Sequence, residues 1–132
     1  MLNLSQLSGE KRRWIALPEP LSGVNLQVRH VGPREQQAFR RKMIDDGILK
    51  SDAQFEVNRG RERAFYRDFA KRYVTDWSGD VRLAEGDTEA PAYDHEKMGE
   101  VFETYGTAFV AVTNALADEA PFFSTNGASS PG

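Results

Sequence analysis

Side chains that commonly perform chemistry are sparse in this chain of 132 residues. Histidine occurs only as His30 and His95, and no third ligand stands near either residue at the spacing of a metal site. Cysteine is absent, which excludes disulfides, thiolate nucleophiles and cysteine-ligated metals. We therefore expect structural or surface roles for both histidines, and no metal.

Carboxylates occur in two adjacent pairs, Asp45–Asp46 and Asp118–Glu119. Each pair falls at the end of an expected helix, where acidic side chains are ordinarily solvated. The sequence has no nucleophile elbow, no phosphate-binding loop and no dinucleotide fingerprint. It predicts a non-enzymatic protein with no catalytic residues and no cofactor.

A row of cations is the sharpest local feature. On a helix, a four-residue spacing would line them along roughly 18 Å of one face. Phosphates could meet such a row, but Glu62 and Asp68 lie on the same segment and the whole chain has a net charge of −3. An exposed basic face is thus favoured over nucleic-acid binding. The candidate partner-binding cations are Arg59, Arg63, Arg67 and Lys71.

Aromatic side chains supply the remaining candidates for partner binding. Trp77 continues a four-residue repeat of aromatic residues and is interpreted either as core or as a half-exposed contact. Phe122 and Phe123 follow a proline near the end of the chain. They either fold back as a lid on the core or anchor a partner.

Two short apolar runs predict a β-hairpin over residues 11–31. Residues 11–17 form the first expected strand, and residues 24–30 alternate apolar and polar side chains at period two. A lone hairpin is marginally stable in water, so it must pack against helices or another chain.

Helical spacing predicts the rest of the fold. We expect a helix over residues 34–45, with Pro33 in its first turn and Gly47 ending it, and a second over residues 60–76. Residues 48–58 are ambiguous.

A last helix is expected to begin after an Asp94 N-cap and to continue through Gly106. Gly106 weakens its middle and would permit a close helix crossing. Its apolar face is predicted to comprise Met98, Val101, Phe102, Tyr105, Phe109, Val112 and Leu116.

The predicted fold class is α+β, mostly helical, with the N-terminal hairpin followed by about three to four helices. We expect a flexible arm over residues 1–10, one globular domain over residues 11–123 with its helical part at 33–118, and a disordered tail over residues 124–132. Without a signal peptide or a long apolar segment, the chain is expected to be soluble and cytoplasmic.

Charge is distributed unevenly along the chain. Residues 1–75 carry 15 Lys and Arg against 9 Asp and Glu, whereas residues 76–132 carry 2 against 11. This asymmetry suggests an external partner, head-to-tail packing of copies, or two halves that neutralise each other.

A resemblance to a known family spans most of residues 11–123, and two segments carry its matching residues. The segment RYVTDWSGDV is followed by an acidic loop and then by PAYDHEKMGEVFETYGTAFVAVTNALADEAPFF, while KRRWIALPEP and GVNLQVRHVG precede them as strands. This arrangement resembles the tail assembly chaperones of long-tailed bacteriophages, although loop 82–90 is more acidic than expected. The matching residues are Val74, Asp76, Trp77, Gly79 and Val81, then Pro91, Tyr93, Asp94 and Glu96.

The resemblance implies a viral protein of virion assembly, present in the cytoplasm of the bacterial host. Its partner would be the tape-measure protein, which it would coat before the tail tube forms, and a longer form would recruit tail tube subunits. The alternatives are a structural virion component, such as a tail-completion or minor tail protein, and a small nucleic-acid-binding regulator. No membrane partner is expected.

Overall fold

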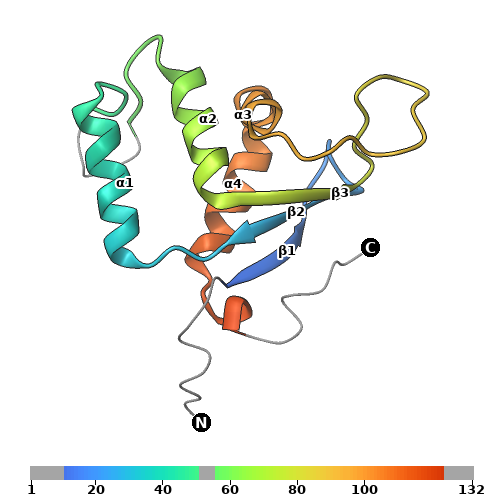
Figure 1. Cartoon of the computed structure of the whole chain (residues 1–132), viewed down its shortest axis with the longest axis horizontal. Coiled ribbons are helices and arrows are strands. Elements are labelled where there is room, and N and C mark those ends of the chain that lie inside the picture. The colour runs from blue at the N-terminus through green and yellow to red at the C-terminus, as the bar shows by residue number, and fades with distance from the viewer. Residues whose placement is uncertain (1–10, 51–55, 124–132) are drawn as a thin grey trace.

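A computed structural model describes residues 11–50 and 56–123 and has an α+β fold, as the sequence predicted (Figure 1). The predicted arm and tail, and residues 51–55 of the ambiguous segment, lie outside these residues. The described residues form a three-stranded sheet and four α-helices. The elements are β1 (Arg12–Ala16), β2 (Val24–Arg29), α1 (Pro33–Asp45), α2 (Glu62–Tyr73), β3 (Val74–Gly79), α3 (His95–Thr104), α4 (Gly106–Ala117) and the 3₁₀ turn η2 (Ala120–Phe123).

The sheet is antiparallel with the order β1-β2-β3. Ile15 pairs with Leu26, and Leu26 pairs with Trp77, so three buried side chains form a row across the strands. The predicted hairpin is confirmed, and its period-two alternation buries Leu26 and Val28 completely.

The third strand corrects the sequence prediction of a helix over residues 60–76. The helix ends at Tyr73, and Val74 begins β3. Two causes favour a strand here: Val74 and Thr75 are β-branched, and β2 would otherwise leave one backbone edge unpaired. Trp77 consequently lies on a strand. The predicted helical part, residues 33–118, therefore also contributes a strand to the sheet.

Helix α1 follows the prediction closely. Pro33 is its first residue, Phe39 and Met43 are buried four residues apart, and Gly47 adopts a φ of 75° directly after the helix end. The ambiguous segment that follows docks onto the core through buried Ile48 and Leu49.

The predicted last helix is two helices. Tyr105 adopts an extended conformation, with φ −118° and ψ 90°, and separates α3 from α4. Tyr105 therefore leaves the predicted apolar face and is 38% exposed. Asp94 caps α3 as predicted, because its side chain accepts a hydrogen bond from the Glu96 amide.

The close helix crossing is at Gly99, not at Gly106. A Cβ on Gly99 would lie 2.9 Å from the Cα of Arg67 in α2, whereas a Cβ on Gly106 would meet nothing within 4 Å. Helices α2 and α3 therefore touch almost backbone to backbone.

Aromatic rings fill the space between the helices. The Phe69 ring lies 4.8 Å from that of Phe109 and 5.6 Å from that of Phe102. The buried side chains of the sheet and helices form one cluster. Within residues 11–50 and 56–123, no helix is long and apolar enough to cross a membrane.

Candidate partner-binding groove

Trp77 joins the end of the sheet to the segment that precedes α3. Its indole Nε1 donates a hydrogen bond of 2.8 Å to the carbonyl oxygen of Pro91, and its ring meets Tyr93 edge to face at 5.0 Å. The side chain is only 9% exposed, as the core interpretation predicted. Trp77 thereby fixes both ends of the intervening loop.

Gly79 is required where β3 ends. Its φ is +85°, and a side chain there would collide with the carbonyl oxygen of Gly23 in the β1–β2 turn. The same carbonyl accepts a hydrogen bond of 2.9 Å from the Asp80 amide. The hairpin turn and the end of β3 are thus held together, and the chain turns away into the loop.

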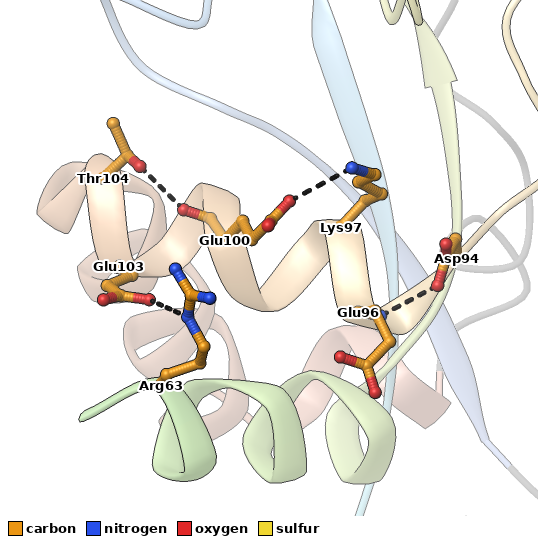
Figure 2. A network of polar contacts seen from close by, with 7 residues as sticks. All are labelled: Arg63, Asp94, Glu96, Lys97, Glu100, Glu103 and Thr104. Carbon is orange, nitrogen blue, oxygen red and sulfur yellow. Dashed lines mark hydrogen bonds and ion pairs between the residues drawn. The ribbon is translucent and has the colours of Figure 1, made fainter. Parts of the chain in front are cut away.

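The loop leads into α3, and polar contacts lie along this helix (Figure 2). Asp94 accepts from the Glu96 amide at 2.9 Å, and Lys97 Nζ lies 3.5 Å from a Glu100 carboxylate oxygen. Arg63 on α2 reaches Glu103 on α3 at 3.6 Å. The two ion pairs are exposed, and each stabilises the fold by less than about 1 kcal/mol. Their main effect is to define a charged face on α3.

Between this helix and the loop lies a groove of about 480 Å³. We call it the Trp77 groove. Two apolar residues on its wall are unusually open to solvent, Leu83 at 71% and Tyr105 at 38% exposure. The apolar lining comprises Trp77, Val81, Leu83, Pro91, Val101 and Tyr105, and the charged rim comprises Arg82, Asp94, Lys97 and Glu100. An apolar groove with a charged rim is suited to an apolar side chain of a protein partner.

Tyr93 packs against Trp77, one of the residues that line the groove. Burial of the side chain, with the nearby carboxylates of Asp94 and Asp76 as secondary causes, raises the pKa of its hydroxyl well above the ordinary value of 10.0. The hydroxyl oxygen is buried and has no hydrogen-bond partner among the described residues. Tyr93 is thus held neutral and acts through packing.

The predicted cation row is only partly formed. Arg59 lies in a turn with Gly60, whose φ is +82°, and α2 begins at Glu62, so Arg59 is not on the helix. Arg63, Arg67 and Lys71 lie on α2 and are exposed. Arg63 pairs with Glu103, and Arg67 lies 3.5 Å from Asp68. Ion pairing therefore reduces the row to a mixed-charge face.

Phe122 and Phe123 lie apart from the Trp77 groove. They pack near the start of β1 and the residue that follows β2. Phe122 is buried, with its ring 5.4 Å from His30 and the Arg13 guanidinium 5.7 Å from its centre. Phe123 is 40% exposed and also contacts the His30 ring, at 5.2 Å. Phe122 adopts the lid arrangement, and a partner-binding role for Phe123 stays a prediction.

Leu83, Val101 and Tyr105 were not predicted as candidate site residues. Leu83 alone carried a signal, because it is an isolated large apolar residue in an acidic loop. The sequence predicts Val101 and Tyr105 on one apolar helix face; Val101 does pack partly against the core, whereas the break at Tyr105 removes Tyr105 from that face. Among the described residues, no group of histidine and carboxylate side chains could hold a metal ion.

Comparisons with protein-family models, with curated proteins and with solved structures find no match to this chain.

Proposed function

We propose that this protein is a tail assembly chaperone of a long-tailed bacteriophage, which binds the tape-measure protein in the cytoplasm of the bacterial host. One observation carries the proposal. The two segments of the resemblance meet in space, where Trp77 of the first bonds the Pro91 carbonyl and packs on Tyr93 of the second. Together they build the Trp77 groove.

The groove supports this function because of what a tape-measure protein exposes. A long helical protein presents apolar stripes to water until the tail tube encloses it. A groove with an apolar floor and a charged rim can hold one ridge of such a helix. Leu83 and Tyr105, which are exposed in the free protein, would be covered in the complex.

The test is affinity capture of the N-terminally tagged protein from the source cell while phage genes are active, with partners identified by mass spectrometry. Recovery of a very long helix-rich protein, with several copies of the bait for each partner, is the expected result. Recovery of finished tail particles would favour a structural virion component instead. Recovery of nucleic acid alone would favour a regulator.

A matched pair of variants tests the groove itself. Leu83→Asp places a charge in the Trp77 groove, whereas Val110→Asp places one on α4, at a residue that is 53% exposed and does not line the groove. Both side chains are solvent-exposed, so both variants should fold. We expect Leu83→Asp to lose the captured partner and Val110→Asp to retain it. Equal capture by the two variants would remove the groove from the proposal.

A further inference from the structure

A second groove lies between α1, α2 and the start of β3, and it is strongly basic. Its volume is about 420 Å³. Four cations line it against a single acidic residue, Asp68, which itself lies 3.5 Å from the Arg67 guanidinium. The lining residues are Arg29, Phe39, Lys42, Met43, Asp68, Lys71, Arg72 and Thr75. We call this surface the basic groove.

Part of this groove is held in place by the fold. Arg29 Nε donates to the Arg72 carbonyl at 3.0 Å, and the Arg72 guanidinium lies over the Phe39 ring at 5.4 Å. Glu35 approaches Arg29 at 3.6 Å and neutralises part of its charge. Lys42 and Lys71 extend from α1 and α2 as exposed cations at the groove. The groove thus suits an acidic segment of chain.

The most acidic loop of the same protein lies at the far end of β3. Residues 80–90 contain four acidic residues and one cation, which are Asp80, Glu85, Asp87, Glu89 and Arg82. All five are exposed, and the Arg82 guanidinium lies 3.6 Å from the Asp80 carboxylate. The Asp87 carboxylate accepts a hydrogen bond from the Ala84 amide at 3.0 Å, which shapes the loop.

The basic groove and the acidic loop cannot meet within one molecule. Thr75, near the start of β3, lines the groove, whereas the loop follows Gly79 at the end of the strand. A six-residue strand spans about 20 Å. In Figure 1 the loop projects from the end of β3 on the side of the molecule opposite α1.

From this complementarity we infer that copies of this chain associate head to tail, with the acidic loop of one copy docked in the basic groove of the next. Such an interface joins two different surfaces, so each pair of copies still has one free groove and one free loop. Further copies can therefore add to form an open row, or the two free surfaces can meet and close a ring. This self-association is independent of the proposed function, because it involves only copies of this chain and can be measured with the purified protein.

Sedimentation velocity of the full chain at increasing concentration tests the association. At about 0.01 M salt, where the Debye length is about 30 Å, we expect the weight-average mass to rise with concentration. It should rise above the chain's mass of 14.8 kDa. At about 1 M salt, where the Debye length is about 3 Å, the protein should return to a monomer. A monomer at every concentration in low salt would overturn the inference.

Charge exchange identifies the two surfaces. Lys42→Glu/Lys71→Glu makes the groove acidic, and Glu85→Lys/Glu89→Lys makes the loop basic while sparing Asp87. Each double variant alone should remain monomeric, because its groove and loop then carry like charge. An equimolar mixture should associate again, since the acidic groove of one variant accepts the basic loop of the other. Failure of the mixture to associate would contradict docking of the loop in the groove.

Arg59→Glu/Arg61→Glu provides the matched control, since both residues are exposed near the other end of α2 and the change in net charge is the same. This variant should associate like the wild type. Loss of association equal to that of the groove variant would show a general charge effect and overturn the inference. So would a wild type that stays monomeric alone yet binds a DNA duplex through Lys42 and Lys71, which would assign the groove to nucleic acid.

Discussion

Trp77 is the residue on which the geometry of the groove depends most. Its ring belongs to the buried row of the sheet, and its indole nitrogen bonds the Pro91 carbonyl across 14 positions of sequence. One side chain thus connects the core with the loop that forms the groove wall. Loop position and core packing should therefore respond together when Trp77 is changed.

The first prediction concerns Trp77→Phe. Phenylalanine keeps an aromatic ring but removes the donor to Pro91, so the free energy of unfolding should fall by about 1–3 kcal/mol from the lost hydrogen bond and the smaller ring. Urea unfolding followed by circular dichroism measures this change. Amide hydrogen exchange in residues 80–92 should accelerate more than in α1. Uniform exchange across the chain would contradict the anchoring role of the indole nitrogen.

The second prediction concerns Tyr93→Phe, which should behave in the opposite way. The Tyr93 hydroxyl is buried without a partner among the described residues, so its removal deletes an unsatisfied group and keeps the ring that contacts Trp77. The free energy of unfolding should stay unchanged or rise by about 1 kcal/mol. A loss of stability in the same urea assay would mean that the hydroxyl makes a stabilising bond.

Residue chemistry in the sequence identified Trp77 and the Asp94 cap, because both have strong local signatures. It did not identify the groove. The side chains that line it come from a strand, a loop, α3 and the helix break at Tyr105, and the bond between Trp77 and Pro91 links the strand to the end of the loop. Local spacing carries no information about such a contact.

At the scale of elements, α2 and α3 form the tightest contact between helices. Gly99 permits it, since the nearest atoms to a Cβ at that position belong to the backbone of Arg67 and Tyr66. Backbone atoms cannot rotate away as a flexible side chain can. A side chain at residue 99 therefore forces α2 and α3 to move apart.

The third prediction compares two glycines. Gly99→Ala should lower the free energy of unfolding by about 1–3 kcal/mol through overpacking. Gly106→Ala, at the first residue of α4, meets open space and should raise stability by about 0.4–1 kcal/mol by restricting the unfolded chain. Thermal unfolding of both variants measures the difference. If Gly106→Ala were the more harmful change, the assigned helix crossing would be wrong.

The hairpin, α1 and the start of α3 could be predicted from the sequence, because period-two alternation, proline at a helix start and an aspartate cap are local signals. The third strand and the helix break at Tyr105 could not. Residues 74–77 extend an aromatic helical repeat, but pairing with the distant β2, together with the β-branched Val74 and Thr75, makes them a strand. Tertiary pairing thus overrode the helical periodicity.

At the scale of the whole molecule, buried tyrosines make stability depend on alkaline pH. Burial raises the pKa of Tyr93, Tyr73 and Tyr66 above the ordinary 10.0, and the carboxylates of Glu103 and Glu62 add to the rise at Tyr66. The folded state holds these phenolic protons more tightly than the unfolded state does. The stabilisation is complete below about pH 10 and is lost as the pH rises through the folded-state pKa values.

The fourth prediction is therefore a fall in the free energy of unfolding above about pH 10, with a slope of up to about 1.4 kcal/mol per pH unit for each strongly shifted tyrosine. Urea titrations at about pH 8, 10 and 11 measure it. Tyr93→Phe should show a shallower slope than the wild type. Parallel slopes for the two proteins would mean that Tyr93 is not held neutral by the fold.

The packing of η2 against the sheet also brings the first and last elements of the fold together. The Lys11 carbonyl accepts a hydrogen bond of 2.8 Å from the His30 amide, and the Arg13 guanidinium stacks on Phe122, so the start of β1 and η2 meet at one edge of the sheet. A peptide linker between them would give a cyclic polypeptide without distorting the core. Such a ring, opened within the acidic loop, would be a circular permutant with new ends at the Trp77 groove and the old ends sealed together.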